Sequence, residues 1–249
     1  MEYRERFYRS TFSHESRQWF PVKFLESDLW IGVDKGSLDE SMPAYALDAL
    51  IKLRRSMDDY LLVDPTYKKS LVPYDSRDSA PTIFKEMSKV SHRTGIGPMG
   101  AVAGAVAKHI ADMLMQEYQI QDLIIENGGD IWADVSTDVE IAVFAGESPL
   151  SGKVGLHIPK QEFPLGICTS SGTVGPSLSF GKADAVMIVC RDVLLADSYA
   201  TAMANKIQTA DDLQPVIEHI SANNDILGAL AVKDDRMAVC GRYELRLFK

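Results

Sequence analysis

The chain has 249 residues, of which 46% are hydrophobic and 24% are charged, so it can bury one sizeable core and is not expected to be disordered. Its formal net charge of −9, from 35 acidic and 26 basic residues, disfavours general binding to nucleic-acid phosphates. A small anionic ligand remains compatible with this charge, because main-chain N–H groups and metal ions bind anions without net positive charge.

Cysteine usage and hydropathy favour a cytoplasmic protein. The three cysteines, Cys168, Cys190 and Cys240, are far apart and form no CxxC pair, which argues against a disulfide scaffold or a zinc site. The charged N-terminus is not followed by the apolar run of a signal peptide. The longest apolar stretch, 96–107, is interrupted by glycines and is too short to span a bilayer.

The first half of the chain predicts a hairpin followed by helices. Apolar alternation predicts strands over 19–25 and 28–33, with the turn of the hairpin at residues 34–36. Helical periodicity predicts helices over 43–62, 81–90 and 97–118. The polar segment 67–81 predicts an irregular loop.

The second half predicts mostly strands. They cover residues 123–126, 130–135, 140–145, 154–158, 166–169, 185–190, 228–232 and 243–248. Helices are predicted over 192–207 and 211–220. Because strands and helices come in blocks, the pattern favours an α+β fold with a mainly antiparallel sheet and helices on one face.

The chain is expected to form a single domain over residues 1–249, since no Pro-, Gly- or Ser-rich linker divides it. Alanine-rich helices at 100–107 and 196–204 suggest a weak internal duplication, with halves meeting near 145–165.

The first candidate site segment is residues 126–130, between two apolar strands. Its glycines, Gly128 and Gly129, allow a ligand to approach the main chain closely, and Glu126, Asn127 and Asp130 add polar groups. Asn-Gly is also a strong hairpin signal, so a plain turn is the alternative.

The second candidate segment follows the strand at 166–168. Hydroxyls and free main-chain N–H groups suit a phosphate or carboxylate, and a long irregular segment between strands is often functional. Its candidate ligand-binding residues are Thr169, Ser170, Ser171, Gly172, Thr173, Ser179 and Lys182. The alternative is a surface loop with a solvated lysine. Cys168 is a candidate nucleophile, although a buried strand thiol is the favoured interpretation.

The third candidate segment is the helix with Asp197 and Thr201, which are four residues apart and therefore share one face. A carboxylate and a hydroxyl beside phosphate oxygens suit Mg²⁺, which takes few protein ligands. Asp130 and Asp184 are the candidate catalytic bases, with Glu126 as a further carboxylate. The Gly100 and Gly104 pair predicts close packing of a helix on the sheet.

Taken in order, segments 126–131, 169–172 and 195–202 resemble the signature of the ApbE superfamily, which includes Mg²⁺-dependent flavin transferases acting on FAD. Segments 97–104, 145–150 and 166–184 are more similar to a branch of that superfamily whose function is unknown. The resemblance implies duplicated T-fold-like halves, Asp197 and Thr201 as a metal pair, and nucleotide loops at 127–130 and 169–172.

Two departures from the transferases bear on the expected activity. Residues 175–184 carry no histidine where those enzymes have a His-Ile-Ile-Asp-Pro-like segment, and residues 102–107 lack the lysine of their central helix. The resemblance therefore implies binding of an anionic small molecule, such as a flavin nucleotide, with Mg²⁺, and phosphoanhydride cleavage or group transfer. The alternatives are a non-catalytic ligand-binding protein and an enzyme of sulfur or one-carbon metabolism using Cys168. A small-molecule partner is expected, and a homodimer is left open.

Overall fold

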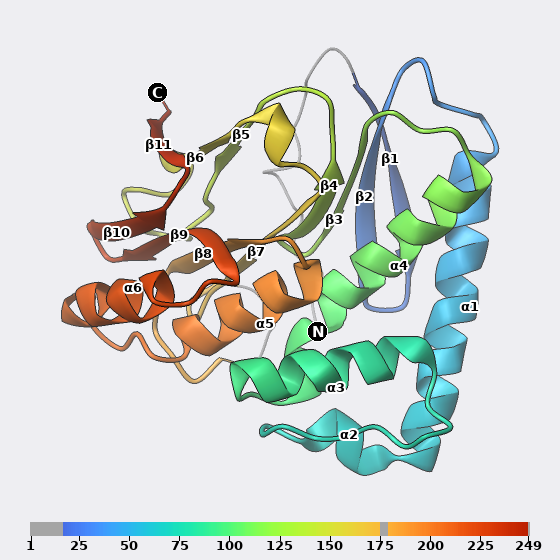
Figure 1. Ribbon diagram of the computed structural model, residues 1–249, viewed down its shortest axis with the longest axis horizontal. Coiled ribbons are helices and arrows are strands. Elements are labelled where there is room, and N and C mark those ends of the chain that lie inside the picture. The colour runs from blue at the N-terminus through green and yellow to red at the C-terminus, as the bar shows by residue number, and fades with distance from the viewer. Residues whose placement is uncertain (1–16, 175–178, 249) are drawn as a thin grey trace.

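The computed structural model describes residues 17–174 and 179–248 and forms three layers (Figure 1). In these ranges the central layer is an antiparallel eight-stranded sheet in the order β1-β2-β3-β4-β7-β8-β9-β10. Helices cover one face of this sheet, and a three-stranded sheet in the order β11-β6-β5 covers the other. The predicted α+β class, with a mainly antiparallel sheet and helices on one face, is confirmed.

The elements of the first half largely follow the predicted boundaries. They are β1 (Arg17–Phe24), β2 (Ser27–Asp34), α1 (Met42–Val63), α2 (Pro65–Lys69), α3 (Thr82–Thr94), the 3-10 turn η2 (Pro98–Ala101), α4 (Val102–Glu117), β3 (Leu123–Asn127) and β4 (Asp130–Asp134).

Two predictions for this half are wrong. The β1–β2 hairpin turns at Leu25 and Glu26, because Phe24 pairs with Ser27, and residues 34–36 instead lead toward α1. Leu25 adopts a positive φ of 51°, which an apolar residue seldom does, so the sequence carries no turn signal there. The predicted loop over 67–81 is irregular only from residue 70 onward, because its first three residues belong to α2, whose Tyr67 is fully buried and donates a hydrogen bond to Phe84 O at 2.7 Å.

The second half adds the strands of both sheets and two helices. The elements are β5 (Val139–Ala142), β6 (Val154–Ile158), η3 (Lys160–Glu162), β7 (Leu165–Ser170), β8 (Ala185–Cys190), α5 (Val193–Ala204), η4 (Ala210–Asp212), α6 (Leu213–Ser221), β9 (Ile226–Lys233), β10 (Arg236–Gly241) and β11 (Glu244–Leu247). The internal duplication remains a prediction.

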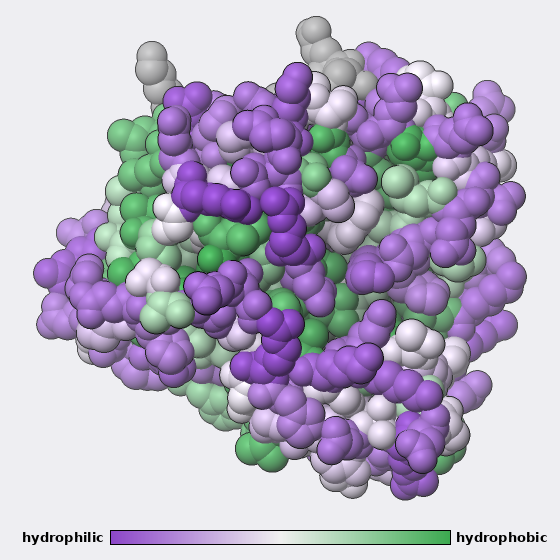
Figure 2. All heavy atoms as spheres, viewed as in Figure 1, coloured by the Kyte–Doolittle hydropathy of each residue, from purple (hydrophilic) through white to green (hydrophobic). Residues whose placement is uncertain are grey.

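Two hydrophobic clusters lie on opposite faces of the central sheet. In β8, Val186 and Ile188 face the helices while Met187 and Val189 face the small sheet, which explains why this strand is apolar throughout. Figure 2 shows that hydrophilic residues cover most of the face viewed, with hydrophobic residues reaching the surface at the left, near β10 and β11. Within the described ranges, no helix is long and apolar enough to cross a bilayer.

The helices α4 and α5 lie on the centre of the sheet and contact one another. A Cβ at Gly104 would lie 2.8 Å from Val193 O and 3.1 Å from Asp197 Cβ. The helix α4 packs on the sheet against β3 and β4, but Gly104 allows its approach to α5 and not, as predicted, its approach to the sheet. The close approach of these two helices determines where Asp197 lies.

Candidate functional site

Residues 126–130 form the end of the β3–β4 hairpin. Asn127 pairs with Asp130, and Gly128 and Gly129 have φ values of 73° and 102°. The hairpin interpretation is confirmed, with Gly128 and Gly129 as the two central residues of the turn and Asn127 as the last residue of β3. Glu126 Oε1 accepts a hydrogen bond from Gly129 N–H at 2.8 Å, and Asn127 Nδ2 donates one to Ala103 O at 3.1 Å. The turn is thereby attached to the start of α4.

The end of β7 lies beside this turn. Asp130 pairs with Cys168 across β4 and β7, and Thr169 N–H donates to Gly129 O at 3.2 Å. Thr169 and Ser170 are half-buried at this edge of the sheet. The sheet register therefore places the start of the second candidate segment next to the first segment, with the Ser170 side chain on the helix-covered face and the Thr169 side chain on the other face.

The helix α5, which packs on β7 and β8, brings the third candidate segment to the same region. Asp192 caps its N-terminus by accepting a hydrogen bond from Leu194 N–H at 2.9 Å. One turn later, Asp197 Oδ2 accepts a hydrogen bond from Gly104 N–H at 2.8 Å. Thr201 Oγ1 donates to Ser170 Oγ at 3.4 Å. Segments predicted separately from the sequence are thus brought together by α4, α5, β4 and β7.

Two buried carboxylates on the helix-covered face of the sheet, Asp130 and Asp197, form what we term the acidic cluster; their exposed fractions are 8% and 7%. Glu126 is also buried, but the alternation along β3 places its side chain on the other face of the sheet. Burial raises the pKa of Asp130 well above its ordinary value, and the negative charges of Asp197 and Glu126 raise it further. Burial also raises the pKa of Asp197 to about 7, although N–H groups of Gly104 and Ala103 oppose the shift. Such a cluster is stabilised by a proton or by a cation.

Glycine main chain and hydroxyl side chains lie at the end of the β3–β4 hairpin, at the end of β7 and on α5. Gly128 is exposed, and Gly129, Thr169, Ser170 and Thr201 are half-buried. A small ligand in this region would meet hydroxyls and glycine main chain before reaching the carboxylates. Two other surface cavities lie elsewhere: one of about 360 Å³ between α6 and β10, and one of about 540 Å³ beside α1 and Pro81.

Metal-binding groups in this region are few. Among residues 17–174 and 179–248, no group of three or more His, Cys, Asp or Glu side chains is arranged to hold a metal ion. A cation here would depend on the Asp197 carboxylate and the Thr201 hydroxyl, in agreement with the low number of protein ligands that Mg²⁺ takes. The assignment of this pair to a metal remains a prediction.

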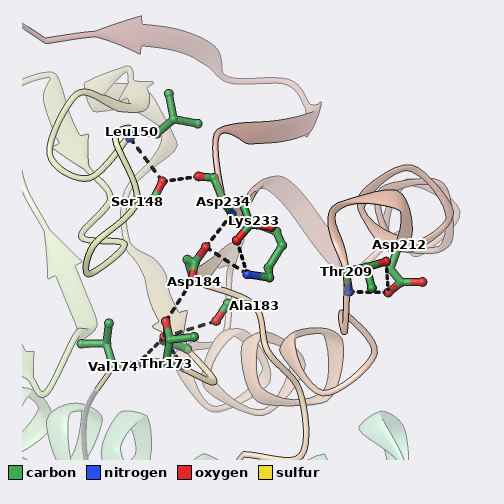
Figure 3. Close-up of polar contacts among 11 residues, drawn as sticks. Ser148, Leu150, Thr173, Val174, Ala183, Asp184, Thr209, Asp212, Lys233 and Asp234 are labelled. Atoms are coloured by element: carbon green, nitrogen blue, oxygen red, sulfur yellow. Dashed lines mark hydrogen bonds and ion pairs between the residues drawn. The ribbon is translucent and has the colours of Figure 1, made fainter.

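The other predicted residues of the second segment lie away from the acidic cluster. Thr173 Oγ1 donates to Asp184 Oδ1 at 3.0 Å, and Asp184 forms an ion pair with Lys233 at 3.6 Å (Figure 3). Ser171 Oγ accepts hydrogen bonds from the N–H groups of Thr173 and Val174. The Asp184 carboxylate is thus engaged on the side of the β9–β10 hairpin, and its catalytic role remains a prediction.

The last members of the segment hold it to neighbouring elements. Gly172 N–H donates to Ala183 O at 2.8 Å, and Ser179 Oγ donates to Asn205 Oδ1 at 3.1 Å. Lys182 has an exposed side chain, and its N–H donates to Ile207 O at 2.7 Å. Residues 175–178, part of the stretch without histidine, lie outside the described residues.

Cys168 is a buried strand thiol, as the favoured interpretation predicted. It is fully buried in β7, and its Sγ lies 3.6 Å from Val193 O. Burial raises the pKa of the thiol well above its ordinary value, and the charge of Asp130 adds to the shift. Both effects oppose the thiolate that a nucleophile needs.

The sequence analysis did not predict the hydrogen-bond and ion-pair partners of Asp197 and Asp184. The N–H groups of Ala103 and Gly104 contact Asp197, but main-chain donors leave no mark in a sequence apart from the small residues that permit the approach. Lys233 and Asp234 contact Asp184 across almost 50 residues of chain, and nothing local indicates this pairing.

A family model described as AbpE bacteria matches residues 9–235. The chain belongs to this family. Its relatives include a UPF0280 protein of Methanocella arvoryzae, 36% identical over 82% of each chain. Another is a UPF0280 protein of Methanocaldococcus jannaschii, 33% identical over 90% of this chain and 91% of the relative. The predicted likeness to ApbE proteins is confirmed at the level of the family.

Solved structures of other proteins share this fold. The apo flavinyl transferase ApbE of Pseudomonas stutzeri superposes with a TM-score of 0.58 at 12% identity, covering 90% of this chain and 93% of that one. The apbe protein of Thermotoga maritima gives a TM-score of 0.51 at 13% identity, covering 86% and 94%. At these identities the likeness shows the fold alone.

Proposed function

We propose that this AbpE-family protein binds a small anionic nucleotide together with Mg²⁺ beside the acidic cluster. The observation that carries the proposal is the convergence of two buried carboxylates, Asp130 of β4 and Asp197 of α5, next to half-buried hydroxyls. Buried like charges raise the free energy of the folded protein unless a proton or a cation accompanies them. A divalent cation therefore fits the donor set that the fold supplies.

Asp197 and Thr201 are the residues that would hold the cation, because they lie one helical turn apart and both offer oxygen. Gly104 N–H fixes one Asp197 oxygen, which orients the carboxylate. Bound Mg²⁺ supplies charge neutralisation and polarisation of phosphoryl oxygens.

The region of the glycines and hydroxyls suits the phosphate part of a ligand. Gly128 and Gly129 have no side chain to block close approach, and the Ser170 hydroxyl lies on the same face of the sheet as Thr201. Asp130 is the proposed general base, since it is the carboxylate beside Asp197, and burial raises its pKa above the ordinary value. The reaction class would be phosphoanhydride cleavage or group transfer.

A flavin nucleotide is the first ligand to test, because the similar structures include proteins named as flavinyl transferases. The absence of histidine from 175–184 and of lysine from 102–107 favours a second candidate, in which the protein binds the ligand without transferring it. The third alternative, which uses Cys168 as a nucleophile, receives no support from its burial. The small-molecule partner, the homodimer and the cytoplasmic location remain predictions.

Calorimetric titration with FAD and ADP, each with and without Mg²⁺, tests binding, and chromatography of the mixtures tests cleavage. We expect Mg²⁺-dependent binding that Asp197→Asn weakens by about 10- to 100-fold. Asp58→Asn is the matched control, since Asp58 is an exposed carboxylate on α1. Binding without cleavage would support the second candidate, a protein that binds the nucleotide without acting on it. No binding of either nucleotide would refute the proposal.

A further inference from the structure

The carboxylate of Asp184 has partners on both of its oxygens. Oδ1 accepts a hydrogen bond from Thr173 Oγ1 at 3.0 Å, and Oδ2 accepts one from Asp234 N–H at 2.6 Å. Lys233 Nζ lies 3.6 Å from Oδ2, and the Lys233 and Asp184 side chains are only 13% and 11% exposed. Figure 3 shows Asp184 between the 173–174 segment and the β9–β10 hairpin. A carboxylate held in this way is suited to fixing a segment in place.

The β9–β10 hairpin is itself held firmly at this point. Asp234 has a positive φ of 57°, which non-glycine residues seldom adopt, and its side chain pairs with Lys233 Nζ. Its carbonyl accepts a hydrogen bond from Ser148 Oγ at 2.5 Å. The anchor for Asp184 is therefore connected to the loop between β5 and β6.

This connection accounts for the sequence segment 145–150, which the proposed function does not use. A Cβ at Gly146 would lie 2.6 Å from Val174 Cγ2, and Gly146 has a positive φ of 57°. Ser148 holds the hairpin while Gly146 lies against Val174. The 145–150 segment therefore touches both chain segments that Asp184 joins: the β9–β10 hairpin through Ser148 and residue Val174 through Gly146.

Residues 171–174 form a compact turn that continues directly from β7. Ser171 Oγ accepts hydrogen bonds from Thr173 N–H at 3.0 Å and Val174 N–H at 2.9 Å. Gly172 N–H donates to Ala183 O at 2.8 Å. The Thr173 hydroxyl connects this turn to Asp184, and Ser170, immediately before the turn, contacts Thr201.

We propose that Asp184, paired with Lys233, is a positioning residue that fixes the 171–174 turn and so places the Ser170 hydroxyl, which contacts Thr201, for an anionic ligand. This inference rests on the proposed function for its ligand, but the anchor exists independently of it. It assigns Asp184 a role different from the general base expected from the sequence.

The test compares Thr173→Val, which removes the hydroxyl that reaches Asp184, with Thr173→Ser, which keeps it. Thr173 is exposed, so both variants are expected to fold. Amide hydrogen exchange at residues 172–174 should be about 10-fold faster in Thr173→Val and close to wild type in Thr173→Ser. Asp184→Asn, which removes the charge facing Lys233, should also accelerate exchange.

Titration with ADP and Mg²⁺ provides the second readout. Thr173→Val should weaken ADP binding by about 10-fold while the affinity for Mg²⁺ alone is unchanged, and Thr173→Ser should restore ADP binding. Unchanged exchange in Thr173→Val, or faster exchange without a change in ADP affinity, would overturn the inference. If wild-type protein binds no nucleotide, the proposed function and the placement of the Ser170 hydroxyl for a ligand both fail, while exchange still decides whether Asp184 anchors the turn.

Discussion

The main-chain N–H of Gly104 donates a hydrogen bond to Asp197 Oδ2 at 2.8 Å, across the contact between α4 and α5. The glycine serves two purposes, because its missing side chain also lets Val193 O approach. A second glycine, Gly166 of β7, meets the same residue: its Cβ would lie 2.2 Å from Val193 Cα. The first turn of α5, and with it Asp197, is therefore positioned by close contact with glycines on two elements.

Replacement of Gly104 by alanine should destabilise the protein and weaken the site. The added methyl would meet the Val193 main chain and Asp197 Cβ, which cannot move without shifting α5. We expect a loss of about 1–3 kcal/mol of unfolding free energy, measured by urea denaturation, and weaker Mg²⁺ binding. Gly36→Ala is the control, because a Cβ there would meet only the Asp34 side chain at 3.4 Å; equal losses in both variants would contradict the packing argument.

The acidic cluster should make the metal-free protein less stable as the pH rises. The pKa of Asp197 is about 7 in the folded protein against 3.8 as its ordinary value, and the pKa of Asp130 is also raised. Between these values the folded protein binds more protons than the unfolded chain. The stabilisation is therefore complete below about pH 4 and is lost as the pH rises toward about 7.

The comparison of wild type with Asp197→Asn isolates this effect from the other carboxylates. Wild type should lose up to about 1.4 kcal/mol of unfolding free energy per pH unit relative to Asp197→Asn between about pH 4 and 7. Denaturant titrations without metal ions, at several pH values, measure the difference. Parallel pH profiles for the two proteins would mean that Asp197 is not buried as described.

Much of the fold followed from the pattern of apolar residues, and the failures have local causes. The strands β3 and β8 were predicted as short continuous apolar runs, and the helix α1 was predicted because its apolar residues recur with helical spacing. The β1–β2 turn was misplaced because Leu25 gives no turn signal. The helix α2 was missed because it is short, 5 residues, and depends on the burial of Tyr67.

The part of the candidate site that consists of local sequence patterns was predictable. Asn-Gly-Gly-Asp and the Asp197–Thr201 spacing are local patterns, so each was visible in the sequence. The partners of Asp197 and Asp184 were not visible, because they are main-chain groups or lie in other elements. Distinguishing Asp184 from Asp130 required tertiary contacts: the first faces Lys233, while the second lies beside other carboxylates.

Cys168 should resist alkylation in the folded protein. It is fully buried and its thiol pKa is raised, whereas Cys240 on β10 is partly exposed. Iodoacetamide at neutral pH should modify Cys240 first, as read by peptide mass mapping, and Cys168 only after denaturation. Rapid modification of Cys168 in the native protein would revive the alternative that uses it as a nucleophile.

Electron paramagnetic resonance of Mn²⁺, a carboxylate-binding stand-in for Mg²⁺, tests the acidic cluster as a divalent-cation site most directly. Titration of wild type and Asp58→Asn with Mn²⁺ should show a bound ion that Mg²⁺ displaces, and Asp197→Asn should weaken its binding by about 10- to 100-fold. Equal Mn²⁺ affinity in Asp197→Asn and wild type, or no bound ion in wild type, would contradict the assignment of the acidic cluster as a cation site.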